Sequence, residues 1–188
     1  MENIFNYPKR KPTRLKSFDY STNGAYFVTI CTHERKNILS IIDEFSNNAE
    51  DQIKPKLTKY GKITEKIISQ IPEKYESVSV DSYVIMPNHI HLLLTIFKSG
   101  RDDPSPTPFD SLDNGRENPS PTVATVIGWL KFQATKEINK ERNSSSEKIF
   151  QRSFHDHIIR NSEDYYETQK YIQDNPLRWQ FDKLYFGE

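Results

Sequence analysis

Two apolar runs with a two-residue break between them restrict the fold of this chain more than any other feature. The runs are VSVDSYVIM, which starts at Val78, and HIHLLLTI, which ends at Ile96, and only Pro87-Asn88 separates them. Both of these residue types suit the middle of a tight turn, because proline presets its backbone and asparagine tolerates unusual dihedral angles. The sequence therefore predicts a β-hairpin over residues 78–96.

A strand and a helix are predicted before this hairpin. Residues 24–32, GAYFVTICT, are rich in β-branched and aromatic side chains and predict a first strand. Residues 58–72 place apolar side chains at steps of three or four, which predicts an amphipathic helix that Pro72 closes.

Three elements are predicted after the hairpin. Ser120-Pro121 resembles an N-cap with a first-turn proline and predicts a second helix. Residues 148–160 predict a last strand, and Asn161 starts a third helix that should stop near Asn175, because Pro176 follows. The second helix has an apolar face made by Val123, Ile127, Leu130, Ala134 and Ile138.

The order strand, helix, strand, strand, helix, strand predicts an α+β fold. It is the ferredoxin-like βαββαβ order, with an antiparallel sheet, helices on one face and here an additional C-terminal helix. A chain of 188 residues suits one domain. That domain, residues 1–188, would carry an N-terminal arm at 1–20, a flexible proline-rich insertion at 99–121 and a C-terminal tail at 177–188.

Cysteine content and hydropathy indicate a cytoplasmic protein. Cys31 is the single cysteine, so an internal disulfide and a four-cysteine zinc site are excluded, which suits a reducing compartment. Any metal must therefore use histidine, carboxylate or amide ligands. No apolar run approaches the roughly 18 residues that span a bilayer, and the start MENIFNYPKRKP lacks the apolar part of a signal peptide.

Charge is balanced overall but clustered near the start of the chain. Lysine plus arginine and aspartate plus glutamate each number 26, so no global field marks a nucleic-acid binder. A basic cluster could neutralise several phosphates, and a solvated tail is the equally weighted alternative. The cluster consists of Lys9, Arg10, Lys11, Arg14 and Lys16.

His89-Ile90-His91 follows the predicted turn directly. In a strand, residues two apart point to the same face, so the two imidazoles converge. Two neutral imidazoles can bind a divalent ion, and the apolar run behind them would fix their positions. Two hydrogen-bonded histidines at a sheet edge are the structural alternative.

A tyrosine and an asparagine of the predicted third helix could complete such a site. Asn175 follows Tyr171 by four residues, so both share one helical face when the last turn holds. An amide oxygen suits Mg²⁺ or Mn²⁺, and two histidines with one amide leave positions for phosphate and water. The metal would then be a Lewis acid and Tyr171 a nucleophile. Packing is the alternative for Tyr171, because Tyr165 and Tyr166 lie on the same helix.

A second His-x-His, His155-Asp156-His157, precedes the third helix. With His89 and His91 it could form a four-histidine structural site. Structural zinc usually recruits cysteine, however, and the spacing offers no closed tetrahedral set, so a catalytic site is favoured. His33 has no evident partner and is predicted to lie at the surface.

The segment around the first histidine pair resembles a known motif. Residues 83–93, YVIMPNHIHLL, resemble the HUH motif (histidine, hydrophobe, histidine) of single-tyrosine transposases, and within that group the chain is most similar to REP-associated tyrosine transposases. The resemblance covers nearly the whole chain, and the insertion at 99–121 is its main departure. The other matching segments, in order, are Arg14-Leu15 with residues 24–32, residues 154–160 (FHDHIIR) and residues 171–176 (YIQDNP).

This resemblance implies a role for each candidate residue. Tyr171 would be the nucleophile, His89 and His91 would bind the metal, and Asn175 would replace a glutamine or asparagine ligand. The substrate would be single-stranded DNA near a hairpin. Cleavage would leave a 5′-phosphotyrosine and a free 3′-hydroxyl, so that rejoining needs no ATP. The candidate DNA-binding residues are Lys9, Arg10, Lys11, Arg14, Lys131, His157 and Arg160.

Two other functions stay open at this stage. A protein could keep the fold and bind DNA hairpins without turnover, although the complete set of His89, His91, Tyr171 and Asn175 argues against this. Replication initiators and plasmid relaxases share HUH chemistry but are usually larger chains. Monomer and homodimer are also both open: insertion-sequence relatives exchange tyrosine helices between subunits, whereas the tail at 177–188 could hold that helix in its own protomer.

Overall fold

The computed structural model of the protein describes residues 24–42, 54–97, 121–144 and 146–185. The predicted arm at 1–20 lies outside these ranges, as does the predicted insertion apart from Pro121. Among the described helices, none combines the length and apolar character that crossing a membrane requires. The elements are β1 (Gly24–Cys31), η1 (His33–Arg35), β2 (Ser40–Ile41), β3 (Lys56–Leu57), α1 (Lys59–Ser69), α2 (Ile71–Lys74), β4 (Val78–Ile85), β5 (His89–Ile96), α3 (Val123–Glu141), β6 (His155–Ile158), α4 (Ser162–Asp174) and η2 (Asn175–Phe181).

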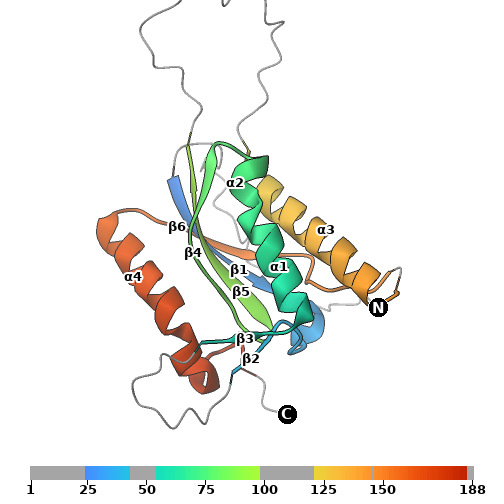
Figure 1. The fold of residues 1–188 in the computed structure, drawn as a ribbon. Coiled ribbons are helices and arrows are strands. Elements are labelled where there is room, and N and C mark those ends of the chain that lie inside the picture. The colour runs from blue at the N-terminus through green and yellow to red at the C-terminus, as the bar shows by residue number, and fades with distance from the viewer. Residues whose placement is uncertain (1–23, 43–53, 98–120, 145, 186–188) are drawn as a thin grey trace, which may run out of the picture.

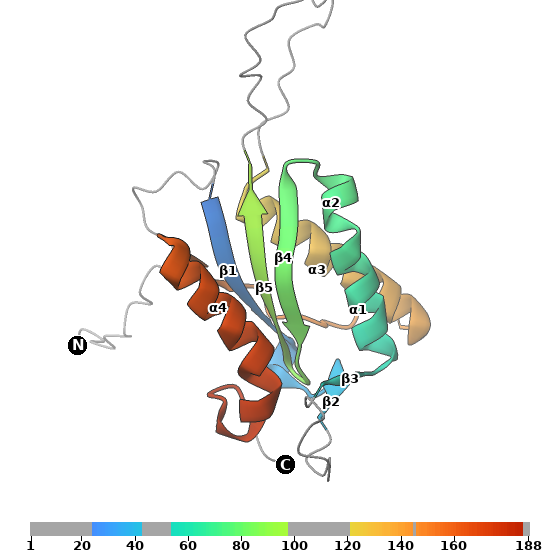
Figure 2. The same cartoon turned by 60° about the vertical axis from the view of Figure 1, so that its left-hand side comes forward.

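A four-stranded antiparallel sheet in the order β4-β5-β1-β6 forms the centre of the protein. Helices α1 and α3 lie together on one face of this sheet, and α4 lies on the other (Figures 1 and 2). The predicted ferredoxin-like fold is therefore confirmed, and the additional C-terminal helix covers the face that α1 and α3 leave open. The predicted hairpin is confirmed as β4 and β5.

Each face of the sheet carries its own apolar cluster. The larger cluster lies under α1 and α3 and includes Leu92 and Leu94 of β5. The smaller one lies under α4 and includes Leu93 of the same strand, packed with Ile172 and Trp179. Because β5 is covered on both faces, its sequence HIHLLLTI is an almost continuous apolar run instead of an alternating one.

The segment predicted as one helix over 58–72 forms two. Thr58 caps α1, because its hydroxyl oxygen accepts a hydrogen bond from the backbone N–H of Gly61 at 3.2 Å. Pro72 lies in the first turn of the short helix α2, where a missing N–H costs nothing, so it begins a second helix instead of only ending the first.

The second predicted helix exists, but its cap is different. Thr122, not Ser120, is the N-cap of α3, and its hydroxyl accepts from the Thr125 N–H at 3.2 Å. Residue 120 lies outside the described residues. The predicted apolar face is confirmed, since all five of its side chains are buried.

The last strand is shorter than the predicted range of 148–160. It pairs with β1 only over residues 155–158, after an isolated bridge between Thr32 and Phe150. Thr29 and Thr32 are three residues apart, whereas their partners His155 and Phe150 are five residues apart. The segment from Phe150 to His155 therefore has two extra residues, which bulge out of the ladder. Carbonyls in this segment accept hydrogen bonds from α3 instead, because the Lys131 ammonium donates to Gln151 and Arg152.

Helix α4 begins where the sequence predicted and ends at Asp174, next to the predicted stop near Asn175. Asn161 caps it, accepting from the Asp164 N–H at 2.8 Å. Asn175, however, keeps helical backbone angles (φ −57°, ψ −41°), so the expectation that the residue before Pro176 leaves the α region is wrong. Proline brings no N–H, and the chain accommodates this by tightening into η2, which carries Pro176 in its first turn.

Candidate active site

The turn between β4 and β5 is fixed by hydrogen bonds from other segments. The Pro87 carbonyl accepts from the backbone N–H groups of Ile38 and Leu39 at 2.9 and 3.0 Å. The Asn88 carbonyl accepts from the N–H and the hydroxyl of Thr32 at 2.9 and 3.0 Å. His89 therefore starts its strand from a turn whose backbone cannot shift without breaking these contacts.

Both histidine rings are oriented by hydrogen bonds at Nδ1. Thr29 Oγ1 lies 2.9 Å from Nδ1 of His91, and Asn88 Oδ1 lies 2.9 Å from Nδ1 of His89. The Asn88 amide nitrogen donates to the Leu184 carbonyl, so its oxygen faces the imidazole and accepts from it. His89 thus carries its proton on Nδ1 and has a lone pair on Nε2.

Burial keeps the two imidazoles uncharged. Their ring centroids are 4.6 Å apart, and their exposed fractions are 0% and 3%. Desolvation lowers the pKa of His89 to about 4, although the nearby Asp182 carboxylate opposes this shift. Desolvation and the neighbouring His89 also hold the pKa of His91 well below its usual value. Neutral imidazoles are the form that binds a metal ion.

Helix α4 places Tyr171 against this pair. Its ring contacts His91 and Phe27 edge-on, with centroid distances of 5.4 and 5.8 Å, and 41% of the residue is exposed. Desolvation, reinforced by the Asp182 charge, raises the pKa of the phenol. The other two tyrosines of α4, Tyr165 and Tyr166, contact each other at 5.9 Å. Tyr171 is thus the tyrosine of α4 that the structure brings to the histidines.

Asn175 and Asp182 complete the surroundings of the histidines. Asn175 is buried, and its amide nitrogen donates to Oδ2 of Asp182 at 3.1 Å while its Oδ1 has no partner. One ligand atom each of His89, His91 and Asp182 lie within 4.8 Å of one another. Asp182 was not predicted from the sequence, although it is the single acidic residue in residues 176–187.

The residues of this cluster fit a divalent metal ion. Nε2 of His89, Nε2 of His91 and Oδ1 of Asn175 are all buried without a hydrogen-bond partner. Each buried polar atom without a partner lowers the stability of the fold by about 1–3 kcal/mol, so a ligand that pairs with all three atoms would be stabilising. Neutral nitrogen and oxygen donors beside a carboxylate are suitable ligands for a divalent cation.

The second histidine pair is not brought into this cluster. His155 and His157 are exposed, and Nε2 of His157 lies 3.0 Å from the Asp164 carboxylate in the first turn of α4. Within the described part of the chain, the histidines that share a possible metal site are His89 and His91. The four-histidine alternative therefore has no geometric support. His33 is only partly exposed, and its Nε2 lies 3.7 Å from the Glu34 carboxylate.

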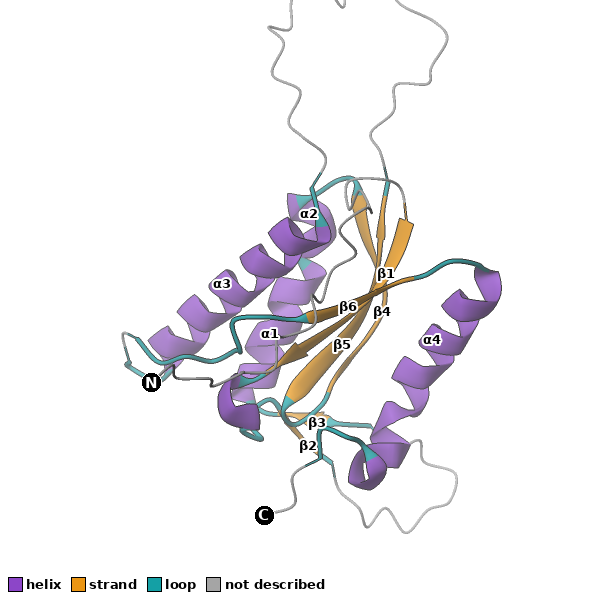
Figure 3. Ribbon diagram, turned by 180° about the vertical axis from the view of Figure 1, so that it is seen from behind, coloured by secondary structure: helices purple, strands orange, loops and turns teal. Residues whose placement is uncertain are grey.

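The predicted DNA-binding residues are dispersed. Arg160 is exposed between β6 and α4, close in sequence to His157. Lys131 belongs to α3, which lies on the opposite face of the sheet from α4 (Figure 3). Its ammonium donates to the carbonyls of Gln151 and Arg152 at 2.5 and 2.8 Å. The remaining four, Lys9, Arg10, Lys11 and Arg14, lie outside the described residues.

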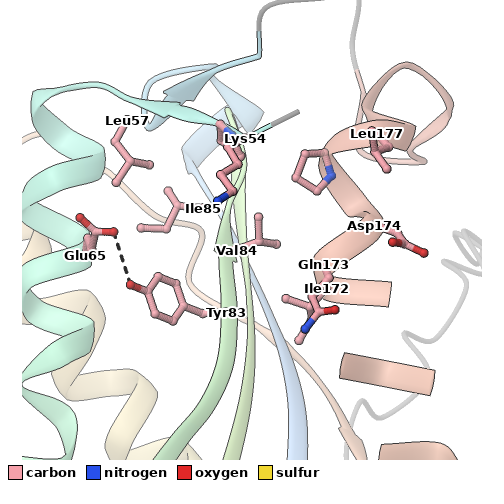
Figure 4. A pocket seen from close by; sticks show the side chains of 12 residues that line it. Lys54, Leu57, Glu65, Tyr83, Val84, Ile85, Ile172, Gln173, Asp174 and Leu177 are labelled. Carbon is pink, nitrogen blue, oxygen red and sulfur yellow. Dashed lines mark hydrogen bonds between the residues drawn. The ribbon is translucent and has the colours of Figure 1, made fainter. Parts of the chain in front are cut away.

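A cavity of about 600 Å³ opens beside β4 (Figure 4). Glu65 of α1 and Tyr83 of β4 are hydrogen-bonded in its wall, and Gln173 faces it from α4. None of the candidate metal ligands lines it, and neither does Tyr171. It is a neighbouring cavity and not a part of the histidine site.

Fold and site together define a ferredoxin-like α+β protein with a paired-histidine hairpin under a tyrosine-bearing helix. No family model matches the sequence. A solved structure of a REP-associated tyrosine transposase bound to a REP hairpin has a similar fold, with a TM-score of 0.54, 19% identity and coverage of 90% of this chain and 76% of that one.

Two proteins of Haemophilus influenzae are similar in sequence. One, of uncharacterized function, is 29% identical over 177 residues, which cover 94% of this chain and 93% of that protein. The other is provisionally named a REP-associated tyrosine transposase and is 26% identical over 168 residues, 85% of this chain and 74% of that protein. The resemblance to REP-associated tyrosine transposases is therefore confirmed in sequence and in fold.

Proposed function

We propose that the protein is a metal-dependent single-strand DNA endonuclease and strand transferase of the transposase type, acting near DNA hairpins. The position of Tyr171 carries this proposal. Its half-exposed ring lies 5.4 Å from that of His91, beside two imidazoles whose buried Nε2 atoms have no hydrogen-bond partner. A nucleophile that is open to solvent beside a prepared cation site is what phosphodiester cleavage by tyrosine requires.

The proposed cofactor is Mg²⁺ or Mn²⁺, held by His89, His91 and Asn175. When bound, such an ion supplies a Lewis acid for the scissile phosphate. Thr29 and Asn88 hold the two imidazoles through Nδ1 and so leave Nε2 for the ion. Asn175 contributes its amide oxygen, because its nitrogen is bonded to Asp182.

The reaction is a transesterification that starts at Tyr171. Its phenol oxygen attacks the phosphorus, the bond to the 3′ oxygen breaks, and a 5′-phosphotyrosine and a 3′-hydroxyl result. Because desolvation raises the pKa of this phenol, it is protonated at neutral pH and must lose its proton during the attack. The leaving 3′ oxygen gains a proton. The reverse attack by a 3′-hydroxyl rejoins a strand and releases Tyr171 without ATP.

The proposed partner is single-stranded DNA with a hairpin, and the similar transposase structure, which is bound to a REP hairpin, supports this. His157 and Arg160 are proposed DNA contacts, because both are exposed where β6 leads into the tyrosine helix. The basic arm is a further proposed contact. Residues 1–188 would form one transposase-like domain, which acts as a monomer or a homodimer.

The alternative function is a DNA-hairpin binding protein that has lost turnover. It predicts the same DNA affinity without a covalent product. The test is incubation with labelled, hairpin-bearing single strands in Mn²⁺ or in EDTA, followed by a denaturing gel. We expect a denaturant-resistant protein–DNA adduct in Mn²⁺ and none in EDTA. Absence of an adduct for every hairpin tested, with binding intact, would favour the alternative.

Substitution of single tyrosines identifies the nucleophile. Tyr171→Phe removes one oxygen and keeps the ring against Phe27 and His91, so the fold should persist while the adduct disappears. Tyr165→Phe and Tyr166→Phe are matched controls on the same helix and should leave the adduct in place. An adduct from Tyr171→Phe, or its loss in either control alone, would contradict the assignment.

A further inference from the structure

Asp182 brings a negative charge to the histidine pair from outside the predicted ligand set. Asp182 directly follows η2, and a carboxylate oxygen lies within 4.8 Å of a ring nitrogen of His89 and of His91. Two imidazoles and an amide are all uncharged donors. A divalent cation that binds to these three groups alone would lose part of its hydration, and no negative charge of the protein would compensate that loss.

The carboxylate is held in place by two hydrogen bonds. Oδ1 accepts from the Leu184 N–H at 2.6 Å, and Oδ2 accepts from the Asn175 amide at 3.1 Å. An ionised carboxylate has about four acceptor positions, so these two bonds leave capacity for a cation. The hydrogen bond from Asn175 to Asp182 uses the amide nitrogen of Asn175, so its Oδ1 is the atom that has no hydrogen-bond partner.

Three buried atoms without hydrogen-bond partners belong to the residues next to this carboxylate. They are Nε2 of His89, Nε2 of His91 and Oδ1 of Asn175, on residues that are 0%, 3% and 2% exposed. Nε2 of His89 and Oδ1 of Asn175 present lone pairs, and a carboxylate cannot donate a hydrogen to satisfy them. Nε2 of His91 presents one as well when its Nδ1 donates to Thr29 Oγ1. A cation shared by all four groups satisfies every one of them at once.

We infer that Asp182 is itself a ligand of the metal ion, so that the site consists of two imidazoles, one amide oxygen and one carboxylate. The inference rests on the proposed metal dependence and deepens it. With a charged ligand in place, the protein holds its ion before DNA arrives, instead of relying on a DNA phosphate to complete the site. Two imidazoles beside oxygen ligands also favour Mn²⁺ over Mg²⁺.

The test measures Mn²⁺ binding without DNA, by titration calorimetry on the full chain. Asp182→Asn keeps the shape and removes the charge, and we expect the Mn²⁺ affinity to fall by at least about tenfold. Asp174→Asn is the matched control, because it removes one carboxylate at the end of α4 that is not among the grouped metal ligands. Its affinity should stay within about twofold of the wild type, since a partly exposed charge acts only weakly at a distance.

A crystal of the wild-type protein grown in Mn²⁺ separates a ligand from a residue that only positions Asn175. The anomalous signal of manganese should lie at bonding distance from a carboxylate oxygen of Asp182. This measurement needs no variant, so it decides the question even if Asp182→Asn fails to fold. A manganese ion that contacts Asp182 only through water, or an unchanged affinity in Asp182→Asn, would overturn the inference.

Failure of this inference differs from failure of the proposed function. If His89→Gln loses Mn²⁺ binding while Asp182→Asn keeps it, Asp182 is not a ligand and the proposed cleavage stands. If Asp182→Asn loses Mn²⁺ binding and the wild type never forms an adduct with DNA, the ligand set stands and the proposed cleavage does not.

Discussion

Gly61→Ala is expected to destabilise the protein, although alanine is the better helix former. Gly61 lies in α1, and a Cβ atom there would stand 2.1 Å from the Leu39 carbonyl oxygen. That oxygen cannot retreat freely, because it accepts hydrogen bonds from the N–H and the hydroxyl of Thr58, both at 3.0 Å. Leu39 is also fully buried, and its N–H donates to the Pro87 carbonyl.

The size of the effect follows from these contacts. Alanine should gain about 0.5–1 kcal/mol over glycine in a helix. Overpacking costs about 1–3 kcal/mol, and weakening two hydrogen bonds to the cap residue Thr58 costs about 0.5–1.5 kcal/mol each. We expect a net loss of about 1–5.5 kcal/mol in the free energy of unfolding, which lowers the Tm by about 2–22 °C for a chain of this size.

Urea unfolding followed by tryptophan fluorescence measures this loss, with Gly128→Ala as the matched control. Gly128 lies in α3, and a Cβ there would meet nothing within 4 Å, so alanine should stabilise by about 0.5–1 kcal/mol. A Gly61→Ala variant as stable as the wild type would refute the packing argument. Since Leu39 also supports the turn before His89, Gly61→Ala should weaken Mn²⁺ binding as well.

Two further outcomes are expected. Lys131→Met should lower the free energy of unfolding, measured in urea, by about 1–3 kcal/mol, because the carbonyls of Gln151 and Arg152 lose a charged donor. The DNA affinity of this variant, measured by fluorescence anisotropy, should be unchanged. A variant with normal stability and weakened DNA binding would instead establish Lys131 as a DNA contact. Hairpin-bearing single strands should bind more tightly than the corresponding duplex, with affinity falling as salt rises because lysine and arginine displace counterions. Equal affinity for both forms would contradict the proposed partner.

Local sequence patterns were sufficient for most of the fold. The Pro87-Asn88 turn, the apolar face of α3 and the cap Asn161 each depend on residues close together in the chain, and the structure contains all three. The same holds for the convergence of His89 and His91, since strand geometry alone puts them on one face.

Features that depend on distant contacts were not predictable. The first half of the predicted last strand is interrupted where Lys131, some twenty residues earlier, donates to the carbonyls of Gln151 and Arg152. Asp182 reaches the histidines only because η2 turns the chain back beneath α4, and no local pattern marks that turn. The nearly complete burial of both histidines was also not predicted from the sequence.

The two halves of the candidate site are attached to the protein differently. His89 and His91 belong to the sheet, whereas Tyr171, Asn175 and Asp182 share one continuous segment that packs through the smaller apolar cluster. Regions with fewer buried contacts open first when a protein fluctuates. Detachment of this one segment would remove the proposed nucleophile and two of the proposed metal ligands in a single event and leave the sheet intact, so the protein would lose the proposed activity well before it loses its fold.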